Sequence, residues 1–231
     1  MATKLKRDKI MSTKLIYFLM ILLLSTIYFS CHKKSDSITG FTEDDTTNNG
    51  GPVIKKPNIY IYPTEKFSLD VQLKFPNGGK IIASAPEYLN SWHIQVEPTG
   101  SINDQYQFLF YEARIPEILQ RKSGWIIKGK DLENFFQENL GNLLFSKKEI
   151  SDFLEYWIPR LRINKTYVIY PHYAKDLSEI VDIRFSVPPD NIIRVLYLIE
   201  EYQGNQIVKL PQVPSHQREG FTVLEWGVVY Q

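Results

Sequence analysis

Two glutamates in apolar, strand-like surroundings are the residues of this 231-residue chain best suited to acid–base chemistry. Glu112 stands in the segment FLFYEAR and Glu225 in the segment TVLEWG. A glutamate within an apolar strand must reach solvent, pair with a cation or keep a raised pKa. Two carboxyl groups about 5–10 Å apart could act as acid and base in glycoside hydrolysis. The structural alternative is that Glu112 faces solvent, or that Arg114 or Arg184 pairs with either carboxylate.

Four further side chains are candidates for ligand binding: Trp92, His93, Tyr111 and Trp226. The two tryptophans could line a cleft, and packing in the core is the alternative for both. The chain has none of the short motifs of a nucleophile elbow, a helical zinc site, a P-loop or a dinucleotide fold. Its four histidines are scattered along the sequence. We therefore predict no metal site and no cofactor.

The charge distribution argues against nucleic acid as a partner. The chain has 27 Lys/Arg and 26 Asp/Glu, a formal net charge of +1. Residues 1–56 hold 9 of the basic and 5 of the acidic residues, so residues 57–231 hold 18 and 21, a net charge of −3. A mildly acidic domain lacks the basic surface that phosphate backbones require.

The N-terminus resembles a bacterial lipoprotein signal peptide. Basic residues precede the apolar run LIYFLMILLLSTIYF, residues 15–29, which ends at Ser30 and Cys31. This order of basic, apolar and small residues is typical of a secretory signal, and the run is short for a spanning helix. Cys31 is the only cysteine, and its position resembles the lipidated cysteine of bacterial lipoproteins. We expect residues 1–30 to be a signal peptide, translated from Met1 or Met11, and Cys31 to carry the lipid that holds the protein on a membrane.

The chain after the signal divides into a tether and one domain. Residues 31–56 contain the lipidated cysteine and a polar segment without apolar periodicity, which predicts a flexible tether. No linker-like composition interrupts residues 57–231, so we expect a single domain there. An uncleaved anchor, or a plain signal peptide with an incidental cysteine, remains an alternative for the N-terminus.

Two blocks of alternating pattern predict strands on either side of a helix pair. The first block contains 58–62, expected at a sheet edge, 67–75 with a hairpin partner at 80–84, and then 91–96, 105–113 and 124–127. The second contains 165–170, 181–187, 192–200, a short strand at 206–210, and 221–229. The pattern predicts an α+β fold, mostly antiparallel, with a helical hairpin between the two blocks.

The helix pair has the clearest local signals in the chain. Asp131 is expected to cap the first helix and Gly141 to end it. In the second helix Ser146 and Glu149 form a capping box, and Pro159 ends an apolar stripe at helical spacing, made by Ile150, Phe153, Leu154, Trp157 and Ile158.

An ordered series of segments resembles an uncharacterised bacterial family of secreted or lipid-anchored proteins. The segments are KPNIYIYP from Lys56, FLFYEA from Phe108, GWIIKG from Gly124, FLEYWIPRL from Phe153 and REGFTVLEWG from Arg218. Members of that family carry similar IYLYP, YLFWEG, FIVYWLP and GFTVVEWGG segments in the same order. The resemblance implies a class and a location, the bacterial cell envelope, and it implies no reaction.

These observations favour a membrane-anchored envelope lipoprotein, periplasmic or surface-exposed, that acts as a binding module. The expected ligands are cell-wall glycan, peptide or another envelope protein. The alternative is a hydrolase of an envelope glycan that uses Glu112 and Glu225. The two functions differ in one structural requirement, because an enzyme of this kind needs both carboxylates in one concave pocket with Trp226 beside them.

Overall fold

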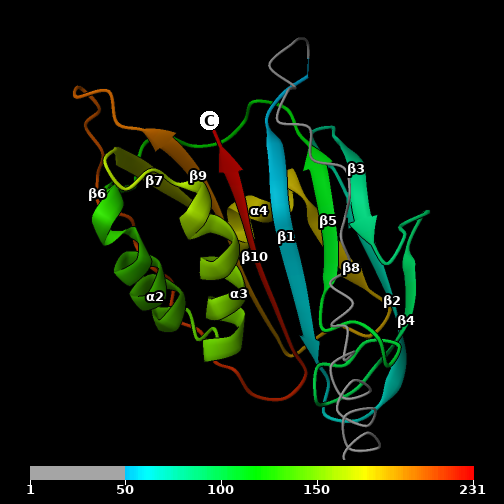
Figure 1. The fold of residues 1–231 in the computed structure, drawn as a ribbon. Helices are drawn as coiled ribbons and strands as arrows, with labels where there is room; N and C mark the ends of the chain where they lie inside the picture. Colours follow the sequence, from blue (N-terminus) through cyan, green and yellow to red (C-terminus); the bar gives the residue numbers. More distant parts are fainter. Residues whose placement is uncertain (1–49) are drawn as a thin grey trace, which may run out of the picture. The chain divides into compact units, whose positions relative to one another are not determined.

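Two β-sheets and a pair of helices form three layers in the computed structural model, which describes residues 50–231 (Figure 1). The large sheet has the strand order β3-β5-β1-β10-β9-β7-β6 and the small sheet the order β4-β2-β8. The strands are β1 (Val53–Tyr62), β2 (Phe67–Lys74), β3 (Lys80–Ala85), β4 (Trp92–Val96), β5 (Leu109–Arg114), β6 (Trp125–Lys128), β7 (Thr166–Tyr173), β8 (Asp182–Phe185), β9 (Asn191–Glu201) and β10 (Thr222–Tyr230). The helices are α2 (Leu132–Asn142), α3 (Lys147–Trp157) and the short α4 (Ala174–Ile180), with 3₁₀ turns at Gly129–Asp131 and Ile158–Arg160.

Both faces of the large sheet are covered, so its central strands are apolar in nearly every position. In β10, Val223 and Val229 join the core shared with the small sheet and α4. Leu224, Trp226 and Val228 point the other way, into the core shared with α2 and α3. The alternation of a strand thus supplies two separate cores. We call the two sides of the large sheet the small-sheet side and the helix side.

The predicted α+β, mostly antiparallel fold is confirmed. The one parallel pair of the large sheet joins β9 to β10 in continuous register from Asn191–Thr222 to Ile199–Tyr230. The blocks mix in space, because β10 lies between β1 and β9 and β8 pairs with β2.

The helix pair also forms largely where the sequence predicts it. Ser146 accepts a hydrogen bond from the backbone of Glu149, whose side chain accepts one from the backbone of Ser146, so the capping box is present. Asp131 makes no capping hydrogen bond, because a 3₁₀ turn precedes α2 and already brings Asp131 into helical geometry. The first helix continues past Gly141 to Asn142, and Leu144, with φ 67°, adopts the left-handed conformation that follows it.

Two strand predictions are wrong in their pairing, and one predicted strand does not form. β1 is an interior strand between β5 and β10, because Pro57 sits at a bulge and Pro63 follows the strand, so neither proline interrupts the ladder. β3 does not form a hairpin with β2 but pairs with β5 in the other sheet. Residues 206–210 form no strand and make only the single bridge between Ser123 and Lys209. Helix α4 was not predicted.

The N-terminal predictions lie mostly outside the described residues. The signal peptide and Cys31 fall within residues 1–49, and β1 begins at Val53, inside the range predicted as tether. Among residues 50–231, none of the helices combines the length and apolar character needed to cross a bilayer.

Candidate functional site

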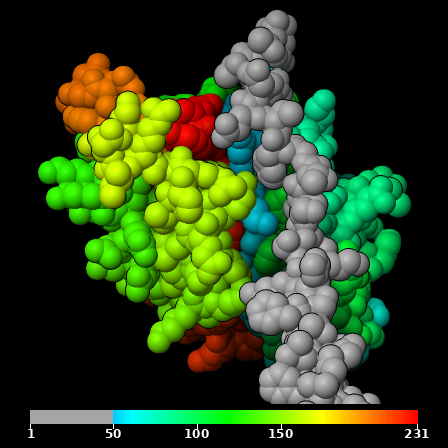
Figure 2. All heavy atoms as spheres, in the orientation of Figure 1, coloured from blue at the N-terminus to red at the C-terminus, as the bar shows by residue number. Residues whose placement is uncertain are grey.

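A bulge in β1 places a lysine among three aromatic rings. The register of β1 shifts between Lys55 and Asn58 on the β10 side and between Ile54 and Asn58 on the β5 side. Lys56 lies in this bulge with φ 54°, a conformation that is uncommon for a residue other than glycine. The bulge turns its side chain to the helix side of the large sheet. Part of β1 reaches the surface beside α3 in the space-filling view (Figure 2).

The Lys56 ammonium group contacts side chains from two other segments. Its Nζ lies 5.2 Å from the ring centre of Phe108, 4.8 Å from that of Phe110 and 5.6 Å from that of Tyr156. All three distances are within the range of cation–π attraction. Phe108 and Phe110 belong to the FLFYEA segment and Tyr156 to the FLEYWIPRL segment, so three of the segments noted in the sequence meet at this point.

Glu112 belongs to the same group. Its neighbours Tyr111 and Ala113 are in the core on the small-sheet side, so Glu112 points to the helix side, as Lys56 does. Glu112 is 8% exposed, and its Oε1 has no hydrogen-bond partner among the described residues. Burial raises the pKa of Glu112, although a backbone hydrogen bond from Lys56 and the charges of Lys55 and Lys56 oppose the shift. We call Lys56, Phe108, Phe110, Glu112 and Tyr156 the Lys56 cluster.

Burial shifts the pKa of Lys56 in the direction opposite to that of Glu112, and in both residues it disfavours the charged form. Burial lowers the pKa of Lys56, while the negative charges of Asp152 and Glu112 raise it and the charge of Arg160 lowers it further. Arg160 lies over the Tyr156 ring, 3.7 Å from its centre, and so borders the cluster. The site therefore combines a half-buried cation with a buried carboxyl group that lacks one hydrogen bond.

A second orphaned acceptor lies beside the cluster on the same side of the sheet. Asn58 is 1% exposed, and its Oδ1 has no partner among the described residues. Its Nδ2 donates to the hydroxyl of Tyr60, which donates in turn to Asp152. Asn58 is in register with Phe110 of the cluster. Two buried oxygens without a donor are unusual within one small region, because most buried polar atoms are hydrogen-bonded.

Glu225 lies on the opposite side of the large sheet. Its Oε2 accepts from Nε of Arg194 at 2.5 Å and its Oε1 accepts from the hydroxyl of Tyr111 at 2.7 Å. The side chains of Arg194 and Glu225 are each 3% exposed. The cation is Arg194, not Arg114 or Arg184 as the sequence suggested, because β9 pairs directly with β10. Glu112 and Glu225 therefore do not converge, and the geometry required of a two-carboxylate hydrolase is not met.

The predicted binding residues are dispersed as well. Trp226 is fully buried, with its indole N–H donated to the carbonyl of Glu149, and Trp92 is 2% exposed, with its N–H donated to the carbonyl of Pro86. Tyr111 is buried against Glu225. Of the four candidates only His93 is exposed, on the outer face of the small sheet. Within residues 50–231 no aromatic side chain is among the exposed large hydrophobic residues.

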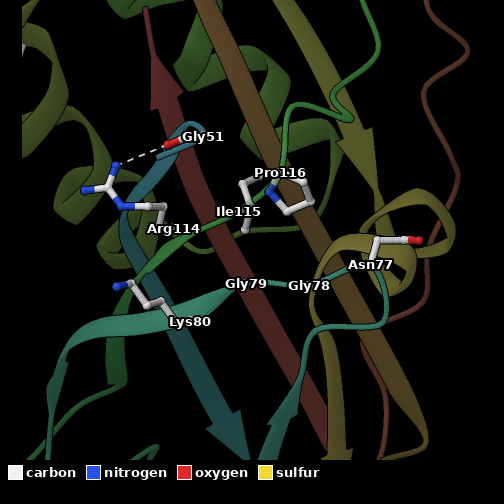
Figure 3. Close-up of a pocket in the computed structure, with 8 residues that line it drawn as sticks. All are labelled: Gly51, Asn77, Gly78, Gly79, Lys80, Arg114, Ile115 and Pro116. Atoms are coloured by element: carbon white, nitrogen blue, oxygen red, sulfur yellow. Dashed lines mark hydrogen bonds between the residues drawn. The ribbon is translucent and has the colours of Figure 1, made fainter. Parts of the chain in front are cut away.

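A shallow depression of about 370 Å³ lies at the end of β3 (Figure 3). It is lined by Gly51, Asn77–Lys80 and Arg114–Pro116. Arg114 donates from Nη1 to the carbonyl of Gly51 at 3.3 Å across its rim. No carboxylate, histidine, hydroxyl or thiol side chain lines it, so its charged groups are those of Lys80 and Arg114. The described part of the chain also contains no group of three or more His, Cys, Asp or Glu side chains placed to hold a metal ion.

The sequence pointed to Glu112 but missed its neighbours. Lys56 and Tyr156 have ordinary local surroundings, and only the pairing of β1 with β5 and the packing of α3 bring them together. A lysine immediately before a proline at the start of an apolar strand was the available signal, because that order suits a bulge. No protein-family model, curated protein or solved structure matches this chain.

Proposed function

We propose that this protein is a membrane-tethered cell-envelope lipoprotein whose domain binds a peptide-containing ligand at the Lys56 cluster. The observation that carries the binding site is the buried carboxyl group of Glu112, which lacks a hydrogen bond and lies next to the half-buried ammonium group of Lys56. The tether and the lipid on Cys31 follow from the sequence pattern at residues 1–56. Lipidation would hold the domain at a membrane surface within reach of wall and envelope components.

The chemistry of the cluster favours a ligand with both donors and acceptors. Leaving a buried acceptor unpaired costs about 1–3 kcal/mol, and a donor on a ligand would recover part of that cost at Glu112. An acceptor such as a carbonyl or carboxylate would pair with the Lys56 ammonium, which lies over three aromatic rings. Peptide groups supply both kinds of atom side by side.

Two of the ligands considered from the sequence are less well supported. A glycan platform needs exposed aromatic rings for stacking, and the exposed large hydrophobic residues of the 50–231 region are all aliphatic. The two-carboxylate hydrolase needs Glu112 and Glu225 on one side of the sheet, and they lie on opposite sides. The remaining candidates are cell-wall peptide and a segment of another envelope protein.

A sedimentation experiment tests whether the ligand is cell-wall peptide. Residues 32–231 are mixed with purified sacculi, either intact or treated with an amidase that removes the stem peptides, and the pellet is quantified. We expect binding to intact sacculi, loss of binding after amidase treatment, and weaker binding by Lys56→Met and Glu112→Gln. Lys147→Met is the matched control, because Lys147 is an exposed lysine of α3 outside the Lys56 cluster.

Cross-linking tests whether the ligand is a segment of another envelope protein. A photoreactive amino acid at position 55 in the full-length protein, expressed in cells, should capture an envelope protein if the ligand is not the wall. The capture should weaken in the Glu112→Gln background. Unchanged binding by both cluster variants in both experiments would show that the Lys56 cluster is not the binding site.

A further inference from the structure

Three polar side chains form a hydrogen-bonded chain on the outer face of the small sheet, away from the Lys56 cluster. In β4 the side chains of Trp92, Ile94 and Val96 are buried and that of His93 points outward. Asp70 of β2 lies directly opposite His93 in the antiparallel register and also points outward. Ser91 precedes β4 by one residue, two positions from His93, and so reaches the same face. The strand pairing therefore sets the order serine, histidine, aspartate.

The distances agree with a relay from a hydroxyl to a carboxylate. The hydroxyl oxygen of Ser91 lies 3.1 Å from Nε2 of His93, and Nδ1 of His93 lies 2.6 Å from Oδ1 of Asp70. In the neutral tautomer that donates from Nδ1, the carboxylate accepts that proton and Nε2 is left to accept from Ser91. The backbone of Asp70 is held in place by Ser186, whose hydroxyl accepts from the Asp70 N–H and whose N–H donates to the Asp70 carbonyl, both at 2.9 Å.

We propose that Ser91 is a nucleophile for ester hydrolysis, with His93 as its general base and Asp70 as the residue that positions the imidazole. The arrangement has the nucleophile–base and base–orienter hydrogen bonds that define a serine triad on unrelated folds. Strand register, rather than a short sequence motif, brings the three side chains together.

The reaction proceeds in two balanced steps. The Ser91 oxygen attacks the ester carbonyl while His93 Nε2 takes its proton, and the carbon–oxygen bond to the leaving alcohol breaks as Nε2 returns that proton to the alcohol. Water then attacks the acyl-serine, gives its proton to Nε2, and releases the carboxylic acid as Ser91 regains a proton. The net change is ester plus water to acid plus alcohol, and no other reactant is needed.

A side-chain amide is placed to stabilise the negative oxygen. Because Val71 pairs with Trp92, Gln72 lies beside Ser91 on the same outer face, and its Nε2 is 3.5 Å from the carbonyl oxygen of Asn90. This contact is long, so the amide can turn to donate to an oxyanion formed at Ser91. Side-chain amides serve as such donors in other enzymes. Gln72 is also in register with Arg184 of β8, whose guanidinium pairs with Asp182 at 2.9 Å.

The openness of the face sets the class of substrate. The side chains of His93 and Asp70 are 75% and 58% exposed, so the relay lies on a flat surface rather than in a pocket. A flat site cannot enclose a small molecule, and it suits acyl esters carried along an extended polymer that lies across the strands. Water competes for each hydrogen bond there, so we expect catalysis well below that of a buried triad.

A fluorophosphonate probe with mass-spectrometric mapping tests the proposal on the full-length protein in mild detergent. We expect one covalent adduct, on Ser91, and its loss in Ser91→Ala and in His93→Gln. Hydrolysis of p-nitrophenyl acetate should follow the same pattern. Ser68→Ala is the matched control, because Ser68 lies exposed on the same face of β2 without a histidine beside it in register.

Asp70 needs a readout that a structural role would not move. We expect Asp70→Asn to slow labelling of Ser91 at least about tenfold, and Asp70→Glu to restore part of the rate. The substituted side chains are all exposed or half-exposed; they are Ser68, Asp70, Ser91 and His93. Thermal unfolding should therefore be nearly unchanged in every variant. No adduct at Ser91, equal labelling of Ser68 and Ser91, or ester hydrolysis that persists in Ser91→Ala with no adduct would each overturn the proposal.

Discussion

The buried ion pair between Arg194 and Glu225 offers a test of how the large sheet is held together. Glu225→Gln keeps the shape of the side chain and an oxygen for the Tyr111 hydroxyl, and it removes the one negative charge bonded to Arg194 among residues 50–231. The guanidinium group would remain 3% exposed without a counter-charge, and its Nη2 already lacks a partner among the described residues. Breaking a buried pair from one side costs about 3–5 kcal/mol.

That loss is large relative to the stability of an ordinary domain. A free energy of unfolding of about 5–15 kcal/mol is typical, so the variant should lose between about a fifth and all of it. For a domain of this size, each kcal/mol lowers the melting temperature by about 2–4 °C, which gives a drop of roughly 6–20 °C. Urea unfolding followed by tryptophan fluorescence measures the change directly, because Trp92, Trp157 and Trp226 are buried.

Two controls separate the effect of burial from the effect of charge. Asp182→Asn removes one partner of the exposed pair with Arg184, and we expect it to cost less than about 1 kcal/mol. The triple variant Arg194→Met, Glu225→Leu, Tyr111→Phe removes the whole network and should unfold close to the wild-type midpoint, since apolar replacement of a buried pair is often neutral. A cost below about 1 kcal/mol for Glu225→Gln would refute the reasoning.

Three further predictions concern the helix side of the large sheet. Phe153→Ala should cost about 3–5 kcal/mol in urea unfolding, because Phe153 is fully buried, whereas Ile207→Ala, at a side chain 95% exposed, should stay within about 0.5 kcal/mol. Burial favours a higher pKa for Glu149, but the hydrogen bonds from Arg218, Tyr62 and Ser146 outweigh burial and hold the pKa below 4.5. Glu149 therefore adds to the free energy of unfolding above pH 4.5, and this stabilisation is lost as the pH falls through the lower pKa of the folded state. Arg218→Met should therefore cost about 2–3 kcal/mol at pH 7 and less near pH 4, where the unpaired carboxylate becomes protonated; an equal cost at both pH values would contradict this. For Glu112 the effect of pH on stability is the opposite, because its pKa is raised. The folded protein binds the proton more tightly and loses stability as the pH rises above 4.5. Glu112→Gln should thus be about 1 kcal/mol more stable than wild type at pH 7 and equal to it near pH 4, and lower stability at pH 7 would count against the orphaned oxygen.

Much of the secondary structure was predictable because its causes are local. The capping box of Ser146 and Glu149 and the apolar stripe behind it involve residues a few positions apart, and α3 begins and ends close to the expected residues. The alternation from Phe67 onward likewise predicts β2 almost to the residue. Patterns of this kind report which side of an element is buried, and they do not say what covers it.

Pairing between distant strands decided the rest. The alternation of side chains predicts which face of its own strand Glu112 or Glu225 occupies, but it does not relate the faces of the two strands. Only the order β5-β1-β10 shows that the two side chains point to opposite sides of one sheet. In the same strand order β1 is an interior strand, whereas the sequence predicted an edge strand, and Lys56 lies beside its aromatic rings.

The sequence by itself determined the α+β class, the capped helix α3 and the identity of Glu112 as a residue in an unusual setting. It also predicts the signal, the lipidated Cys31 and the tether, all of which depend on local composition. Only the tertiary structure brought together Lys56 with Glu112, Arg194 with Glu225, and Asp70 with His93. The physical reason is that each of these groups depends on strand register, which is set by the burial of whole strands and turns and not by the residues nearest to the site.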